Sequence, residues 1–395
     1  MRFAFAFQHS SFCGSLEAAS AGIEEMTARF EAIHTVVYRR LGAFAGWPAN
    51  YGVWAWGDEI VCVFATGRLG RESENLHLED QHHAFTPVQA RSLDGGLTWQ
   101  AEPFCGSVPG ARSLSADEHV TKDLEAGPNV DPALDLITLP TPIDFADGEQ
   151  VVMAARTGIS GRSVSWFYVS KDRARSWNGP FRFEGLKSHE EALSARTDII
   201  TLGRHDALFM LTAPKADGTE GRILCARTQD GGLSFSSEGF VWDEQTGYAI
   251  MPSSTRLADG TIYTVVRRRA HDRFWLEAYR SADLGRTWSC VGTPVRNTGI
   301  MGNPPALVAL PDERLVLLYG FRDPPFGLSA VVSRDRGGTW SEPAVLRDDG
   351  DDADLGYPCA LVRQDGKIIV VYYFNDRDGP ERFIAASILE VPTLS

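Results

Sequence analysis

The sequence predicts an all-β protein folded as a six-bladed β-propeller. The first observation is a polar eight-residue segment, Ser/Thr-x-Asp-x-Gly-x-Ser/Thr-aromatic, which occurs five times in the 395 residues, once with Ala in place of Gly. The second is its spacing: after a longer first interval the segments recur at roughly 50 residues, the size of a four-stranded blade. The third is composition, because 38 Gly and 21 Pro suit many turns rather than long helices.

Each recurring segment has the residue types of a turn between two strands. The Asp can accept backbone N–H bonds, Gly permits a positive φ, and the closing aromatic packs beneath the turn and fixes the hairpin. We call these segments Asp boxes; they span residues 92–99, 170–177, 228–235, 281–288 and 333–340.

A sixth unit without a box completes the predicted ring. Apolar runs at 359–362, 368–373 and 383–388, with an Asp-Gly turn between the first two, are typical of buried strands. The apolar stretch Ala32–Tyr38 is a natural partner for this last blade, and the pairing would leave no open sheet edge. We therefore expect one propeller domain over residues 32–395, preceded by an extension at 1–31 that is helical over about residues 15–31.

Charge and composition exclude several partners. The net charge of −14 argues against a nucleic-acid backbone, and no apolar run approaches a membrane span. Six scattered cysteines, at no metal-ligand or redox spacing, indicate free thiols in a reducing compartment. The apolar start of the chain is too short for a secretory signal, so we expect a cytoplasmic protein, with secretion by another route left open.

Polar residues inside apolar strand patterns mark the predicted site. They are Arg156, Arg196, Asp198, Arg267 and Arg322, and the arginines come from different blades. Because the innermost strands of a propeller converge on one channel, these guanidinium groups could bind a carboxylate in a bidentate manner. Alternatively, each arginine could pair with a neighbouring acid, such as Asp198 or Asp323, and brace a loop.

The boxes at this spacing resemble those of the Asp-box sialidase (neuraminidase) superfamily over roughly residues 35–390. In that family three arginines clamp the substrate carboxylate, an Asp is the acid/base, and a Tyr paired with a Glu is the nucleophile. The resemblance implies Arg267 and, approximately, Arg322 as clamp residues, Tyr357 as the nucleophile and Asp80 as the acid/base. Two positions differ from the family: Gly46 stands at the first arginine and Met251 stands at the Glu.

Two enzymatic interpretations follow. In the first, the protein is an exo-acting glycosidase on an acidic sugar, with Asp80 as acid/base, Tyr357 as nucleophile or stabiliser, and Arg267, Arg322 and Arg196 on the carboxylate. Since Met251 cannot remove the phenolic proton, a base must come from elsewhere, and His82, His83 or His119 are available. In the second, the protein is a polysaccharide lyase on a uronic-acid polymer, in which His83 or Tyr357 transfers the proton.

A third interpretation is a propeller that binds a glycan or a protein without turnover. Trp47 and neighbouring aromatics could stack on sugar faces, although several of them fit core positions as well. We expect no metal and no cofactor, because metal-ligand spacings and phosphate loops are lacking and the acidic loop 348–354 suits a solvated surface. The sugar, its linkage, the stereochemical outcome, the oligomeric state and the binding of a cation by the loop 348–354 stay open.

Overall fold

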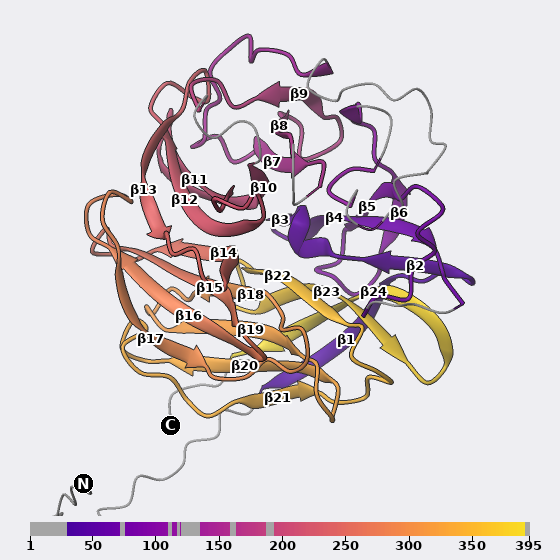
Figure 1. Ribbon diagram of the computed structural model, residues 1–395. Coiled ribbons are helices and arrows are strands. Elements are labelled where there is room, and N and C mark those ends of the chain that lie inside the picture. Colours follow the sequence, from indigo (N-terminus) through magenta and orange to yellow (C-terminus); the bar gives the residue numbers. More distant parts are fainter. Residues whose placement is uncertain are drawn as a thin grey trace, which may run out of the picture.

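The computed structural model describes residues 30–71, 76–109, 113–116, 119, 135–158, 163–186 and 193–391. Within these residues antiparallel sheets stand around a common centre as the blades of a propeller, so the all-β, six-bladed prediction is confirmed (Figure 1). Most of the helix predicted over about 15–31 lies outside the described residues, and Glu31 begins a strand instead. The described part of the chain contains no helix whose length and apolar character would let it span a bilayer.

Blades 1 to 3 follow one another along the chain. Blade 1 consists of β2 (Ala43–Gly46), β3 (Gly52–Trp56), β4 (Glu59–Arg68), β5 (Thr86–Ser92) and β6 (Gln100–Pro103). Its innermost strand is split, since β2 and β3 both pair with β4 and a 3-10 turn, η1 (Pro48–Asn50), separates them. Blade 2 consists of β7 (Val151–Arg156), β8 (Ser165–Ser170) and β9 (Asn178–Arg182). Blade 3 consists of β10 (Ser194–Gly203), β11 (Asp206–Pro214), β12 (Glu220–Thr228) and β13 (Ser236–Trp242).

Blades 4 and 5 are regular four-stranded meanders, and blade 6 borrows a strand. Blade 4 consists of β14 (Tyr248–Arg256), β15 (Ile262–Ala270), β16 (Arg273–Ser281) and β17 (Ser289–Val295). Blade 5 consists of β18 (Pro305–Ala309), β19 (Leu315–Phe321), β20 (Gly327–Ser333) and β21 (Ala344–Arg347). Blade 6 consists of β22 (Gly356–Val362), β23 (Ile368–Asp376), β24 (Gly379–Glu390) and the N-terminal β1 (Glu31–Tyr38).

The ring closes through the strand that the sequence predicts for this role. β1 pairs antiparallel with β24 from Glu31↔Glu390 to Tyr38↔Ile384. β24 also contacts β2 in parallel at Phe44↔Arg382, which joins the last blade to the first. The edge of blade 6 is therefore covered by the chain itself, without a box.

The core lies between neighbouring blades, because side chains alternate along each central strand. On β19, Leu315 and Leu317 pack toward blade 4, whereas Val316 and Leu318 pack toward blade 6. β23 divides in the same way between blades 5 and 1. Both faces of such a strand are buried, which explains its nearly continuous apolar sequence.

The Asp boxes join the last two strands of each of blades 1 to 5 in one recurring arrangement. In the first box the Asp94 carboxylate accepts hydrogen bonds from the Ser92 hydroxyl (2.8 Å) and from the backbone N–H and hydroxyl of Thr98 (2.9 and 2.6 Å). These hydrogen bonds, led by the Thr98 hydroxyl, lower the pKa of Asp94 to about 2. The boxes therefore fix the outer hairpins, as predicted, and lie away from the innermost strands.

Bulges on the innermost strands redirect side chains at comparable positions. The pairing register shifts between Ala195 and Ile199 on β10, between Ile250 and Ser253 on β14, and between Gly356 and Cys359 on β22. At the second and third bulges Met251 and Tyr357 adopt positive φ angles of 50° and 51°. A β-bulge re-aims a side chain out of the regular alternation, and these bulges fall where the polar residues gather.

Candidate functional site

A cavity of about 800 Å³ gathers polar side chains from blades 1, 3, 4, 5 and 6. The ionisable residues that line it are His77, Glu79, His119, Arg196, Glu220, Tyr248, Arg267, Arg322, Asp352, Asp354 and Tyr357. Five of the residues named from the sequence therefore meet here: Arg196, Arg267, Arg322, Tyr357 and the possible base His119.

Tyr357 lies within a group of guanidinium ions. Arg267 Nη1 donates a hydrogen bond of 3.2 Å to the phenolic oxygen, and the guanidinium carbon lies 5.8 Å from the ring centroid. The corresponding carbon of Arg322 lies 5.5 Å from the same ring. Burial favours the neutral phenol, but the positive charges of Arg267, Arg322 and Arg196 outweigh it and lower the pKa of Tyr357 from its usual value. The phenolate is thus stabilised by fixed cations.

Arg267 also shows what the substitution at Met251 does. The Met251 sulfur lies 3.8 Å from Arg267 Nη1, and the Met301 carbonyl accepts a bond of 2.5 Å from Nη2. Its Nε finds no hydrogen-bond partner among the described residues. Where the family resemblance implies a carboxylate, an apolar thioether therefore lies beside the guanidinium, so Met251 supplies no base.

Arg322 and Arg196 are held by groups other than the acids next to them in sequence. Arg322 donates to the carbonyls of Leu355 (2.9 Å) and Gly302 (2.8 Å) and to the Tyr373 hydroxyl (2.8 Å). Asp323 instead accepts from the Asn297 side chain and the Ile300 backbone. The structure thus does not support the alternative in which Arg322 pairs with Asp323.

Arg196 is held between blades. Its Nε donates 3.0 Å to Asn50 Oδ1, and its Nη2 lies 3.8 Å from Glu220 Oε2. Its guanidinium is nearly fully buried at the cavity wall. Arg196, on blade 3, is therefore the third arginine of the site. The position on blade 1 where the family resemblance implies an arginine is occupied by Gly46.

A buried His77–Asp354 pair lies next to Tyr357. His77 Nδ1 is 2.6 Å from Asp354 Oδ1, and the His77 and Tyr357 ring centroids are 6.3 Å apart. Asp354 also accepts from the Leu78 backbone, the Tyr373 hydroxyl and Arg382 Nε, each at 2.9 Å. Burial disfavours the carboxylate, but His77 and Arg382 outweigh it, so the pKa of Asp354 lies well below its usual range.

A second acid–imidazole pair, Glu79 and His119, lines the cavity. Glu79 Oε1 is 3.2 Å from Gln81 Nε2 and 3.4 Å from His119 Nδ1. Glu79 Oε2 is buried and has no hydrogen-bond partner among the described residues. Glu79 therefore keeps one carboxylate oxygen that the described residues leave without a hydrogen bond.

The predicted acid Asp80 and the predicted base His83 do not line this cavity. They bond to one another, with His83 Nδ1 2.8 Å from Asp80 Oδ2, and Asp80 also accepts from the His82 backbone. Glu79 forms a bridge with Leu69, and in such an extended segment alternate side chains point to opposite faces. Glu79 and Gln81 line the cavity, whereas Asp80 between them does not. The chain turns at residues 81–83, where the His83 backbone N–H bonds to the Asp80 carbonyl at 3.4 Å, and His83 does not line the cavity either.

Two predicted binding residues are buried elsewhere. Trp47 is fully buried and stacks on His119, with ring centroids 3.8 Å apart and an interplanar angle of 12°. It therefore supports an imidazole of the cavity wall rather than presenting a face to a sugar. Arg156 is fully buried on β7, where its Nη1 donates to the Thr157 carbonyl, and it does not line the cavity.

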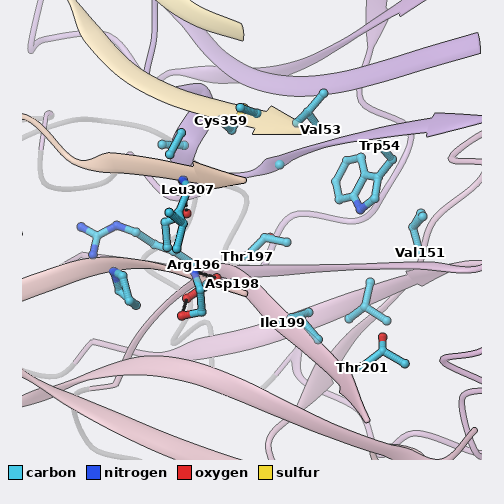
Figure 2. A pocket seen from close by; sticks show the side chains of 18 of the residues that line it. Val53, Trp54, Val151, Arg196, Thr197, Asp198, Ile199, Thr201, Leu307 and Cys359 are labelled. Atoms are coloured by element: carbon cyan, nitrogen blue, oxygen red, sulfur yellow. Dashed lines mark hydrogen bonds between the residues drawn. The ribbon is translucent and has the colours of Figure 1, made fainter. Parts of the chain in front are cut away.

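The predicted Asp198 lies in the central channel, a separate cavity of about 370 Å³ (Figure 2). Innermost strands of all six blades line it, and Arg196 contributes to both cavities. Asp198 accepts hydrogen bonds from the Ser254 backbone (3.0 Å) and hydroxyl (2.7 Å). Burial raises the pKa of Asp198 to about 7, against which the Ser254 hydrogen bonds act.

The described residues contain no group of three or more His, Cys, Asp or Glu side chains arranged to hold a metal ion. The acidic loop at 348–354 is in part buried rather than solvated. Asp354 lines the cavity, and Arg382 Nη2 lies 2.6 Å from Asp352. The expectation of a solvated loop is therefore wrong for Asp354.

Comparison with known proteins agrees with the box pattern and the blade arrangement. A family model described as a BNR repeat-like domain matches residues 150–370. The chain belongs to the BNR repeat-like family. Its resemblance to the Asp-box sialidase superfamily is thereby confirmed at the level of fold. No curated protein matches the sequence.

Three solved structures illustrate how this BNR repeat-like chain relates to others. A protein of unknown function from Dyadobacter fermentans is 21% identical with a TM-score of 0.68, covering 92% of this chain and 99% of its own. A sialidase from Trypanosoma rangeli, bound to sialic acid, is 10% identical with a TM-score of 0.53, covering 91% of this chain and 58% of its own. An α-L-arabinofuranosidase from Fusarium graminearum is 13% identical with a TM-score of 0.53, covering 92% of this chain and 98% of its own. At these identities the similarity shows the fold alone.

Several cavity residues were not singled out as site residues from the sequence. Glu79 is adjacent to the predicted Asp80, and the strand-like alternation around it was the available signal. Asp354 lies three residues before Tyr357, inside the acidic loop. His77 carries no sequence motif, and only the folded ring brings it beside Tyr357.

Proposed function

We propose that the protein is a glycoside hydrolase that acts on a sugar bearing a carboxylate. The observation that carries the proposal is the position of Tyr357, whose phenol is hydrogen-bonded to Arg267 and lies in the field of three arginines within one cavity. Guanidinium groups match a carboxylate in plane and favour anionic ligands. The structural similarity to a sialidase and an arabinofuranosidase supports a glycosidase scaffold.

Tyr357 is the nucleophile in this proposal. A phenol reacts poorly at neutral pH unless its proton is removed or its anion is stabilised. The surrounding arginines stabilise the anion but cannot accept the phenolic proton, and Met251 cannot accept it either. Attack on the anomeric carbon forms a bond to the phenolic oxygen as the bond to the leaving oxygen breaks.

Glu79 is the acid/base in this proposal, in place of the adjacent Asp80. Its Oε2 is buried, lacks a partner among the described residues and belongs to a side chain of the cavity wall. Glu79 donates a proton to the leaving oxygen, and its carboxylate then takes a proton from the water that releases the sugar from Tyr357. His119, held by Trp47, positions this carboxylate.

A polysaccharide lyase is the second candidate, favoured by the two imidazoles in the same cavity as Tyr357. The His77 and His119 rings are 5.1 Å apart. In a lyase, an arginine would neutralise the carboxylate of a uronic acid, one group would remove the adjacent carbon-bound proton, and another would protonate the leaving oxygen.

The products separate the candidates. The purified protein is incubated with aryl glycosides of sialic acid and of uronic acids, with their neutral counterparts, and with uronic-acid polymers. Release of the aryl group from an acidic glycoside alone supports the hydrolase. Formation of an unsaturated uronic-acid product, detected by its ultraviolet absorbance, supports the lyase. Saturable binding of an acidic sugar without either product would contradict both and leave a binding propeller.

A further inference from the structure

The cavity holds a buried acid–imidazole pair that neither the proposed nucleophile nor the proposed acid uses. We propose that His77, oriented by Asp354, is the proton acceptor of the site and takes the place of the carboxylate that Met251 displaces. The inference rests on the proposed hydrolase and deepens it, because it names the base that the phenol of Tyr357 requires.

Asp354 fixes the orientation and tautomer of His77. Its carboxylate is almost fully buried and accepts from the Leu78 backbone, Tyr373 and Arg382 as well as from His77 Nδ1 at 2.6 Å. An ionised carboxylate can only accept hydrogen bonds, so the proton of the neutral imidazole sits on Nδ1. Nε2 is therefore the bare nitrogen.

Nε2 is the part of His77 that is available to the cavity. His77 lines the cavity, and among the described residues no group is hydrogen-bonded to Nε2. The ring meets that of Tyr357 at 72°, with centroids 6.3 Å apart. The two rings are thus neighbours in the cavity wall, and the nitrogen of His77 that is not bonded to the acid is the one that can accept a proton.

The surroundings of His77 favour the neutral imidazole on balance. The rings of Tyr373, His119, Tyr357, Phe44 and Trp47 surround it, and the charges of Asp354 and Arg322 act on it. Burial lowers the pKa of His77 from its usual value, His119 and Arg322 act in the same direction, and Asp354 opposes them. A neutral imidazole can accept a proton, whereas an imidazolium cannot.

Tyr357, His77, Glu79 and one water account for every proton that moves in the proposed hydrolysis. The proton of the Tyr357 hydroxyl moves to His77 Nε2 as the phenolic oxygen bonds to the anomeric carbon, while Glu79 protonates the leaving oxygen. Glu79 then removes a proton from water, whose oxygen bonds to the anomeric carbon. The bond to Tyr357 breaks, and the phenolate recovers its proton from His77. One water is consumed, and every residue returns to its starting state.

The test combines removal of the base with its replacement at Met251. His77→Gln should lower kcat roughly 100-fold or more, the usual contribution of a general base, while the affinity for a non-hydrolysed acidic sugar stays within about twofold. Adding Met251→Glu to the His77→Gln variant should raise kcat at least roughly tenfold above that of His77→Gln alone. The side chain at position 251 contacts Arg267, which is hydrogen-bonded to the phenol. The matched control is His34→Gln, since His34 bonds to Ser387 outside the cavity.

The possible results distinguish a wrong role for His77 from a wrong assignment of the hydrolase activity. An active wild type whose His77→Gln variant keeps its kcat would overturn the role of His77 and leave the hydrolase standing. Equal loss of kcat and of sugar affinity, without recovery in the Met251→Glu background, would also overturn it. A ¹⁵N spectrum with the proton on Nε2 would contradict the orientation by Asp354. Inactivity of the wild type on every acidic glycoside would overturn the hydrolase itself, and this role with it.

Discussion

Glu79→Gln tests which of two adjacent carboxylates is the acid of the site. The substitution keeps the shape of the side chain and its contact with Gln81, which is 3.2 Å away, but removes the proton that the leaving oxygen requires. Because an amide oxygen can still accept that hydrogen bond, the free energy of unfolding should change by less than about 1.5 kcal/mol. The variant should therefore fold.

The expected kinetic effect follows from the buried position of Glu79. Its Oε2 has no partner among the described residues that could take over proton transfer. We expect kcat to fall by about 10²- to 10⁴-fold on a glycoside with a poor leaving group, the range of general acid catalysis. At about 1.36 kcal/mol per tenfold, this corresponds to about 2.7–5.4 kcal/mol of transition-state stabilisation.

Leaving groups of different basicity make the assay specific for acid catalysis. A nitrophenyl or a fluorinated phenyl group departs without protonation, so the loss in Glu79→Gln should shrink to less than about tenfold on such substrates. A loss of equal size on good and poor leaving groups would refute proton donation by Glu79. Asp80→Asn is the matched control variant. A larger loss of kcat in Asp80→Asn than in Glu79→Gln would indicate that Asp80, and not Glu79, is the general acid.

Two further predictions address Tyr357 and Asp198. Tyr357→Phe should lower turnover at least roughly 100-fold with sugar affinity retained within about threefold, because only the reacting oxygen is lost; an unchanged rate would remove the phenol from the reaction. For Asp198, burial raises the pKa from 3.8 to about 7, so the folded protein holds this proton more tightly than the unfolded chain, and stability falls as the pH rises between these values, by up to about 4 kcal/mol. Asp198→Asn should therefore raise the melting temperature at pH 8 relative to wild type but not at pH 4, as measured by calorimetry; equal shifts at both pH values would contradict the ionisation of a buried Asp198.

The fold was predictable because its signals are local and repeated. Each Asp box encodes its own turn through side chains a few residues apart, such as Asp94 and Thr98. The apolar run of β23 and the closing strand β1 follow from the need to bury both faces of a blade and to cover its edge. Only the closing strand joins distant segments, and the ring architecture itself requires that closure.

The site was predictable only in part, because its contacts join distant segments. Arg267 and Tyr357 could be identified since they stand at strand positions that resemble a known motif. The Asp354–His77 bond, by contrast, spans 277 residues and carries no spacing that a sequence pattern could reveal. The choice between Glu79 and Asp80 depended on which face of one extended segment meets the cavity, and a displacement of one residue reverses it.

The requirement for a carboxylate is the central claim, and binding tests it without depending on the chemistry. The affinities of a carboxylated sugar and of its carboxamide are compared by calorimetry for the wild type and for Arg267→Met. We predict that the wild type prefers the carboxylate and that Arg267→Met weakens the binding of the carboxylate roughly 10- to 100-fold, the worth of a charge-assisted hydrogen bond, with little effect on the carboxamide. Equal affinity of the wild type for the two sugars, or an unchanged preference in Arg267→Met, would contradict the account.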